Sequence, residues 1–153
     1  MPRSIRLVLA TGLLAALALG NVASTSAGGP KALDARMVGI PAGAPTVQGL
    51  LGGGAPWVID DGRAKLFADG RLDVDIEGLV LASNGTNPIA NGRAIVTCNS
   101  VAAASSPVVP FSATGDAEVN TVVSLPSPCF APAVFFVGVL PNGAERWFAV
   151  TGL

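Results

Sequence analysis

The chain has 153 residues, a formal net charge of −1, only 12% charged residues, and neither histidine nor tyrosine. This charge balance leaves no electrostatic footprint for nucleic acid or for an anionic membrane surface, so neither is expected as a partner. The absent residue types exclude a Ser-His-Asp triad, a Cys-His pair, a histidine-ligated zinc or copper ion and a tyrosine nucleophile within this chain.

The first residues have the pattern of a secretory signal. Arg3 and Arg6 precede an uncharged apolar run over residues 7–19, and small residues follow at positions 25–27. The run is shorter than the roughly 20 residues that a membrane span needs, so the pattern predicts a cleaved signal peptide over residues 1–27. We therefore expect a secreted protein, or one in a periplasmic-type compartment, without a membrane span after cleavage. The alanine- and glycine-rich composition suggests a bacterial source.

Residues 28–56 are rich in glycine, proline and alanine, and they include the run Gly52–Gly54. Glycine and proline interrupt regular structure, and only Met37–Ile40 has a strand-like sequence. We interpret this segment as a loosely held N-terminal arm with one short strand. A single β domain is then expected over residues 57–153.

The clearest strand pattern lies at Arg71–Glu77, where apolar and acidic residues alternate with a period of two. Ala68–Gly70 precedes it, and a three-residue loop with Gly70 in the left-handed region would make a hairpin with residues 63–67. This register sets apolar residues against each other on one face and opposite charges against each other on the other face. The predicted pairs are Leu66 with Leu72, Ala64 with Val74, Lys65 with Asp73, and Arg63 with Asp75.

The rest of the chain continues in short strands that are separated by turn clusters. Residues 84–88 are predicted as a turn cluster and residues 99–110 as a loop. Pro141-Asn142-Gly143 is a strong hairpin signal between two strands that are apolar on both faces and therefore predicted to be central. This hairpin would pair Val137 with Trp147 and Phe136 with Phe148. The predicted strands are 93–98, 117–125, 133–140 and 144–150.

About seven to nine short strands without an amphipathic helix predict an all-β fold, a small antiparallel β-sandwich. A small β-barrel is the alternative. The layout resembles immunoglobulin-like sandwiches in general outline, but it departs from their Cys…Trp…Cys spacing because no Trp lies between Cys98 and Cys129. These two cysteines are expected to form a disulfide, as is usual in an exported chain. A metal site on both thiolates would lack nitrogen ligands, and neither a metal nor another cofactor is expected.

Three residues are weak candidates for ligand binding. Trp57 follows Pro56 at the domain entrance and could offer a flat platform, and Asp60-Asp61-Gly62 could bring oxygen ligands to calcium in a loop. The acidic residues of Arg71–Glu77 are expected to be solvated partners of Lys65 and Arg63. Carboxylate chemistry of the glycosidase type needs two nearby carboxyl groups, one with a raised pKa. Its candidates are Asp60, Asp61, Asp116, Glu118 and Glu145.

By elimination, the leading hypothesis is a secreted, non-enzymatic domain with a structural, surface-associated or protein-binding role. Its partner would be another extracellular protein or a cell-surface component. The second hypothesis is a module that binds a small molecule, a glycan or calcium through Trp57 or the Asp60–Asp61 loop. The third is a carboxylate-dependent hydrolase. A pocket that contains two acids would favour the hydrolase, and an exposed Trp beside a groove would favour the binding module.

Overall fold

The computed structural model describes residues 29–43 and 45–152, so the predicted signal peptide over residues 1–27 lies outside the described residues. Every regular element in the described ranges is a β-strand, as the alternating pattern predicted. These ranges hold no helix long and apolar enough to cross a membrane. The strands are β1 Lys31–Gly39, β2 Thr46–Val47, β3 Leu50–Leu51, β4 Trp57–Val58, β5 Asp61–Phe67, β6 Arg71–Glu77, β7 Val80–Leu81, β8 Asn91–Cys98, β9 Val101–Ser105, β10 Val109–Pro110, β11 Ala117–Val122, β12 Ala133–Val139 and β13 Glu145–Thr151.

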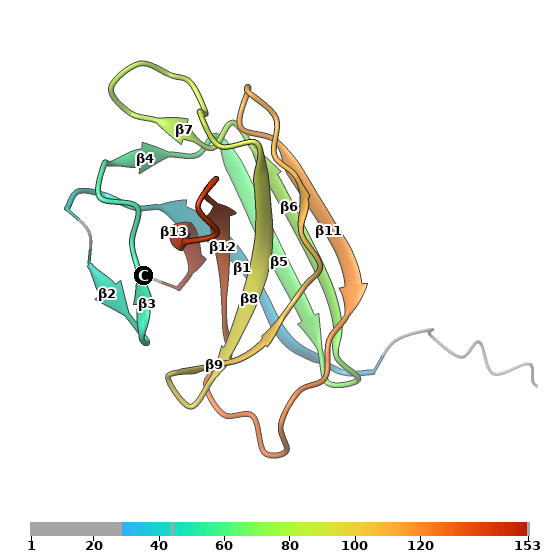
Figure 1. Cartoon of the computed structure of the whole chain (residues 1–153). Helices are drawn as coiled ribbons and strands as arrows, with labels where there is room; N and C mark the ends of the chain where they lie inside the picture. Colours follow the sequence, from blue (N-terminus) through green and yellow to red (C-terminus); the bar gives the residue numbers. More distant parts are fainter. Residues whose placement is uncertain (1–28, 44, 153) are drawn as a thin grey trace, which may run out of the picture.

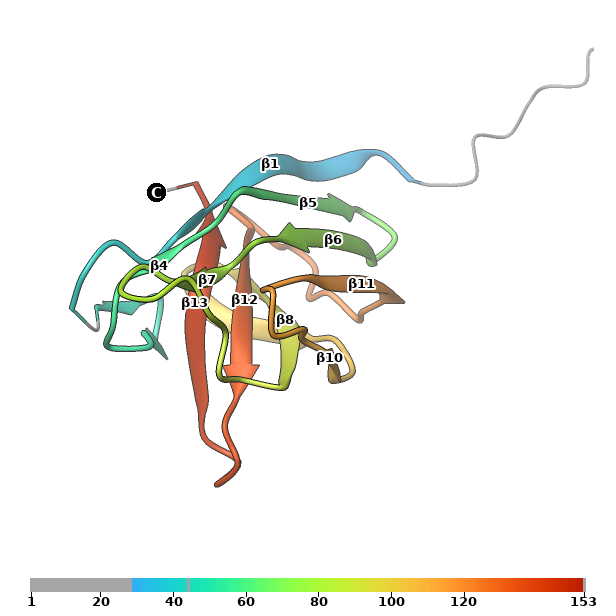
Figure 2. The same cartoon turned by 90° about the horizontal axis from the view of Figure 1, so that it is seen from above.

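Nine of these strands form one antiparallel sheet in the order β10-β8-β12-β13-β1-β5-β6-β11, and β9 pairs with β8 outside this order. The sheet curls into a half-barrel (Figure 1). Its strands β1, β5, β6 and β11 make one layer, and β8, β12 and β13 make the layer that faces it (Figure 2). The apolar core lies between the two layers, so the fold combines features of the predicted sandwich and of the barrel alternative. The remaining short strands pair as β2–β3 and β4–β7.

The hairpin of β5 and β6 has the predicted register. Leu66 pairs with Leu72 and Ala64 with Val74, and these four side chains are buried. Lys65 lies opposite Asp73 and Arg63 opposite Asp75 on the outer face. Gly70 has a φ of +88°, which confirms the left-handed position in the turn. The alternation of buried and exposed residues therefore determined the register without further tertiary information.

The N-terminal arm differs from its prediction, because residues 31–39 form a nine-residue strand in the middle of the sheet. Residues Lys31–Arg36 pair with β5, and Met37–Gly39 pair with β13, so β1 joins the two layers. The predicted strand at Met37–Ile40 marked only its last part. The first part carries three charged residues and two small alanines, a composition with low strand propensity, and pairing with β5 overrides that propensity.

A second difference lies within residues 99–110, which were predicted as a loop and instead contain β9 and β10. Cys98 pairs with Val101 across a two-residue turn. Its central residues Asn99 and Ser100 have φ of +56° and +65°, as a two-residue hairpin of this kind requires. The Ala- and Ser-rich β9 has little intrinsic strand propensity, so its pairing with β8 decided its conformation.

The C-terminal hairpin of β12 and β13 is central and covered on both faces, as predicted. Val137 pairs with Trp147 as expected, but Phe136 pairs with Ala149 and not with Phe148. A β-bulge between Phe136 and Val137 shifts the register. Phe148 is the residue left without a partner in this register, and its ring stacks on Trp57 in the core.

Cys98 and Cys129 are joined by a disulfide with their Cα atoms 5.0 Å apart. The bond ties the tip of the β8–β9 hairpin to the connection that leads from β11 to β12 (Figure 1). The backbone N–H of Asn99 donates to the carbonyl of Phe130 at 2.9 Å beside it. The disulfide therefore holds an irregular segment against the sheet.

Candidate functional site

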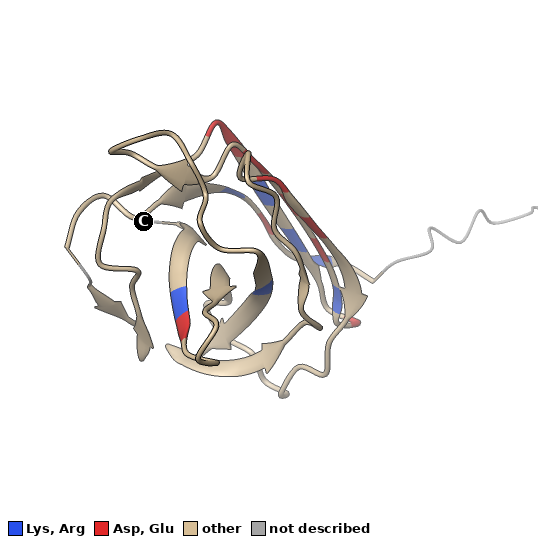
Figure 3. Cartoon of the chain, turned by 45° about the horizontal axis from the view of Figure 1, so that its top comes forward, with Lys and Arg blue, Asp and Glu red and all other residues tan. Residues whose placement is uncertain are grey.

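Charged side chains are concentrated in one layer of the fold. Nine of the ten acidic residues lie on or beside β1, β5, β6 and β11, and only Glu145 lies in the other layer. Of the basic residues that the structure describes, only Arg93 and Arg146 lie outside the charged layer. Figure 3 shows this separation as red and blue bands on the outer strands. Because the acidic residues outnumber the basic ones there, the charged layer carries a negative net charge.

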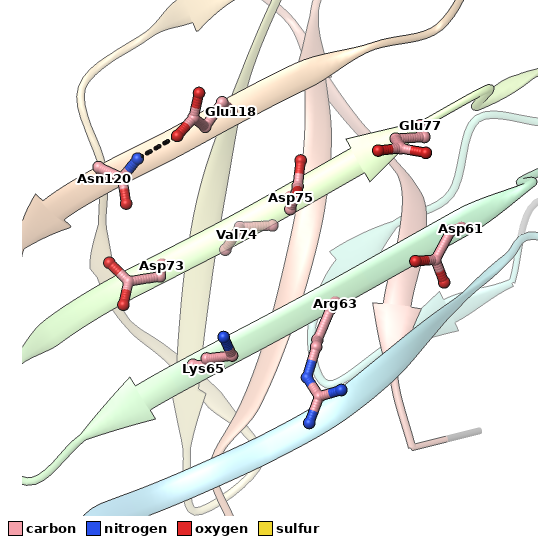
Figure 4. A pocket seen from close by; sticks show the side chains of 9 residues that line it. All are labelled: Asp61, Arg63, Lys65, Asp73, Val74, Asp75, Glu77, Glu118 and Asn120. Carbon is pink, nitrogen blue, oxygen red and sulfur yellow. Dashed lines mark hydrogen bonds between the residues drawn. The ribbon is translucent and has the colours of Figure 1, made fainter.

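The outer surface of this layer, which we call the charged face, contains a groove of about 370 Å³ (Figure 4). The period of two along each strand turns every second side chain toward it. The side chains that line it belong to Asp61, Arg63 and Lys65 of β5, Asp73, Asp75 and Glu77 of β6, and Glu118 and Asn120 of β11. Val74 of β6 also borders the groove, although its side chain is buried in the core. Five acidic residues therefore meet two basic residues in one groove.

The ion pairs on this face differ from those expected. Arg63 donates to Oδ1 of Asp34 on β1 at 2.7 Å, although Asp75 lies opposite it on β6. Lys31 also contacts Asp34, at 2.6 Å. The hydrogen bonds from Lys31 and Arg63 lower the pKa of Asp34 below its ordinary value of 3.8. Among the described residues, the ammonium group of Lys65 has no carboxylate within ion-pair distance.

Within the described ranges, the acids of β6 and β11 consequently have no cationic partner. No Lys or Arg nitrogen in the described ranges lies within ion-pair distance of Asp73, Asp75, Glu77 or Glu118. Glu118 accepts a hydrogen bond from the amide of Asn120 at 2.5 Å. The negative potential of the charged face is therefore not neutralised within the domain.

Asp60 and Asp61 line two different hollows of the charged layer, although both also border a third, open hollow beside Trp57. Asp61 lines the charged groove and lies 3.7 Å from Arg36. Asp60 lies beside Gly78 and lines a second, open hollow at the end of β6 and β11 together with Asp116. No group of three or more acidic or cysteine side chains within residues 29–43 and 45–152 is arranged to hold a metal ion.

Trp57 is not an exposed platform. Only 4% of its surface is exposed, and its ring stacks on Phe148 with 4.0 Å between ring centroids. The short pair of β4 and β7 crosses one end of the half-barrel and brings this ring into the core (Figure 1). Trp147 is also fully buried, so neither Trp presents a flat face for a sugar ring. The sequence did not reveal this, because the position of Trp57 depends on a pairing between short strands far apart in the chain.

The second hollow contains several carboxylates, which raises the hydrolase hypothesis. Asp116 accepts hydrogen bonds from Thr114 Oγ1, Gly78 N–H and Ser112 Oγ at 2.5–3.0 Å. These bonds lower the pKa of Asp116 below its ordinary value of 3.8, the opposite of what a general acid needs. The other acids of the hollow, Asp60, Asp75, Glu77 and Glu118, are all exposed.

Two members of the charged face were not identified from the sequence. Asp34 lies in a segment interpreted as an arm, and Asn120 lies in a strand whose outer face was not considered. The alternation along residues 117–122 could have revealed that Glu118 and Asn120 share a face. Their position beside β6 could not be derived from the sequence, because the paired residues of the two strands lie more than forty positions apart in the chain.

Comparison of the chain with protein-family models, with curated proteins and with solved structures found no match.

Proposed function

We propose that this chain is a secreted, non-enzymatic domain that binds another extracellular protein through its charged face. The observation that carries the proposal is the groove in which five acidic residues meet two basic ones, while the acids of β6 and β11 have no cationic partner among the residues that the structure describes. A partner with a basic surface complements this face. Electrostatic complementarity of this kind accelerates association and selects among partners.

The alternatives fit the same geometry less well. A glycan-binding module uses exposed aromatic rings, and both Trp residues are buried. The acid ladder spreads along three strands and does not converge on one position, as the ligands of a calcium ion must. The disulfide and the signal-like sequence of residues 1–27 support export. An extracellular basic protein or cell-surface component is therefore the partner class that we propose.

The test uses residues 28–153 in immobilised form and the extracellular fraction of the producing organism. One variant neutralises the face with Asp73→Asn, Asp75→Asn, Glu77→Gln and Glu118→Gln. Its matched control keeps the charges and changes the shapes with Asp73→Glu, Asp75→Glu, Glu77→Asp and Glu118→Asp. All retained proteins are identified by mass spectrometry.

The expected partner is retained by the wild type and by the charge-conserving control, and it is lost from the neutralised variant. Surface plasmon resonance with that partner should show binding that weakens with added salt, because exposed charges are screened. The neutralised variant should bind at least roughly tenfold more weakly, since each exposed ion pair contributes up to about 1 kcal/mol. Equal retention by both variants would refute the proposal.

A further inference from the structure

Strand β11 forms a free edge of the curled sheet. It pairs only with β6, through an unbroken register of six residues from Ala117 to Val122. The backbone N–H of Val123 donates to the carbonyl of Gly70 at 2.9 Å, which continues the same register. In an antiparallel ladder, alternate residues direct their backbone groups to opposite edges. Odd-numbered residues of β11 therefore bond to β6, and even-numbered residues direct their N–H and C=O groups away from it.

The even-numbered residues are Glu118, Asn120 and Val122, and all three are exposed. No described segment other than β6 pairs with this strand, and no backbone hydrogen bond joins it to β10, although β10 lies nearby. Figure 1 shows β11 as the outermost orange strand of its layer. Three N–H and three C=O groups are thus available to an added strand.

The opposite edge of the sheet carries devices that discourage strand addition, and β11 does not. A β-bulge interrupts the pairing of β9 with β8 between Val96 and Thr97. Pro107 precedes the short β10, and Pro110 belongs to it. Bulges and prolines are common means by which natural proteins protect sheet edges. β11 has neither, and Glu118 is its only charged residue. The two edges therefore differ in their capacity to accept a strand.

We propose that β11 accepts an extended segment of a basic partner as an added antiparallel or parallel strand beside the charged face. This inference rests on the proposed function and specifies how the partner is held. Main-chain hydrogen bonds to Glu118, Asn120 and Val122 would supply affinity, and side chains on the two faces of the added strand would supply specificity.

The chemistry of the segment follows from the two faces of β11. On the outer face, an added strand would lie beside Glu118 and Asn120, with Asp73 and Asp75 of β6 one strand further. Lysine or arginine at alternate positions complements that face. On the inner face, Val119 and Val123 are buried and Thr121 is half-buried. The intervening positions of the segment should therefore be apolar or β-branched.

A second copy of this chain is a poorer occupant of the same edge. Pairing two β11 strands would place two charged faces side by side in one continuous sheet. Each face brings five acidic residues against two basic ones, so the two would repel each other. Charge complementarity thus favours a foreign basic strand over self-association.

The test uses the ¹⁵N-labelled domain of residues 28–153 with its disulfide intact, and a short synthetic peptide of alternating lysine and valine. In the free domain, the amides of Glu118, Asn120 and Val122 should exchange quickly, and those of Val119 and Thr121 should be protected by β6. Peptide binding should slow exchange of the first group at least roughly tenfold. A peptide of alternating glutamate and valine is the matched control and should cause no protection.

Three substitutions separate backbone pairing from charge. Asn120→Pro removes an N–H that is not used in the β6 ladder, and it should raise the Kd of the lysine–valine peptide by more than roughly tenfold. Asn120→Ala also removes the side chain that lines the groove but keeps that N–H, so it should raise the Kd clearly less than Asn120→Pro does. Glu118→Lys does not alter the backbone, and it should raise the Kd by roughly fivefold, the value of one exposed ion pair. Thermal melts confirm that each variant is folded.

The outcomes distinguish this inference from the proposed function. Salt-sensitive binding without protection of Glu118, Asn120 and Val122 would overturn strand addition and leave the charged face as the binding surface. Protection of the same amides in peptide-free protein at high concentration, with doubled mass in light scattering, would overturn it in favour of a second copy. Failure of the peptide to bind would also overturn strand addition. The charged-face proposal is tested separately, by whether the neutralised variant still retains the partner protein.

Discussion

At the scale of single residues, the tightest constraint lies at the turn between β5 and β6. Gly70 combines a φ of +88° with close packing, since a Cβ atom there would lie 2.0 Å from the carbonyl oxygen of Val123. Gly143, in the turn between β12 and β13, has a similar φ of +79° but no heavy atom within 4 Å of such a Cβ. A substitution at Gly143 therefore introduces backbone strain alone, whereas the same substitution at Gly70 introduces both strain and steric overlap.

We predict that Gly70→Ala lowers the free energy of unfolding by roughly 3 kcal/mol or more, because strain and overlap add. Gly143→Ala should lower it by only about 1–2 kcal/mol, the expense of a left-handed alanine. Urea unfolding of both variants measures the difference. Equal losses would show that the Val123 carbonyl moves aside at little cost.

Neighbouring residues of β6 should respond in opposite ways to substitution. Val74 is 2% exposed in the core, whereas Asp75 is exposed and lacks a cation within ion-pair distance. Val74→Asp should cost several kcal/mol of a total stability of about 5–15 kcal/mol, because it buries an unpaired charge. Asp73→Asn and Asp75→Asn should each change stability by less than about 1 kcal/mol. Urea unfolding would contradict the face assignment if Asp75→Asn proved as damaging as Val74→Asp.

At the scale of elements, three carboxylates bind neighbouring groups in the charged layer: Asp69 and Asp116 lie at strand ends, and Asp34 lies within β1. Asp69 accepts backbone hydrogen bonds from Gly29 and Arg71 at 3.1 and 3.0 Å, and these lower its pKa below its ordinary value of 3.8. Asp116 holds the turn that precedes β11 through Thr114, Gly78 and Ser112. Lys31 and Arg63 bind Asp34 across β1 and β5. Strand ends here depend on ionised acids.

These lowered pKa values predict how stability changes with pH. Near pH 3.8 the unfolded chain binds more protons at Asp34, Asp69 and Asp116 than the folded chain does. Their contribution is therefore complete well above pH 3.8 and is lost as the pH falls below 3.8, through the lower folded values. Urea unfolding between pH 6 and pH 2 should show this loss, and Asp116→Asn should make the slope shallower. An unchanged slope would show that the turn does not depend on the charge.

At the scale of the whole molecule, one continuous sheet makes both layers, and β1 joins them. The central strands β12 and β13 are buried on both faces, and the core includes residues from both layers. The disulfide closes a sequence separation of 31 residues near one end of the half-barrel. Cys98 is itself part of the core and Cys129 packs against it, but most core residues come from the strands of the two layers, so we expect their packing to specify the fold without the bond.

We predict that Cys98→Ser with Cys129→Ser lowers the free energy of unfolding by roughly 3–4 kcal/mol without changing the fold, since the bond chiefly restricts the unfolded chain. Far-ultraviolet circular dichroism and urea unfolding measure both effects. The wild-type protein should also have a mass two hydrogens below that of its dithiol form. Loss of native structure in the variant at neutral pH would instead make the bond essential for folding.

Local patterns predicted those parts of the fold in which neighbours in sequence are neighbours in space. The β5–β6 register followed from alternating charge and apolarity around Gly70, and the Pro141-Asn142-Gly143 turn located the last hairpin. The candidate site was not predicted as a site: the ladder of β6 and its opposite residues on β5 were identified as a solvated charged face, and β11 was not placed beside β6. Arg63, the cation expected for Asp75, pairs instead with Asp34. Asp34 lies in the part of β1 that the sequence did not indicate as a strand.

The sequence by itself determined the all-β class, the inward and outward faces of the regular strands and the pairing within local hairpins, because a side-chain period of two is a property of each strand alone. Tertiary structure decided the strand character of Lys31–Arg36 and Val101–Ser105, the burial of Trp57 and the free edge of β11. Each of these depends on which distant strand supplies hydrogen bonds or covers a ring. Pairing between distant strands is governed by the packing of the whole sheet, and short windows of sequence do not encode it.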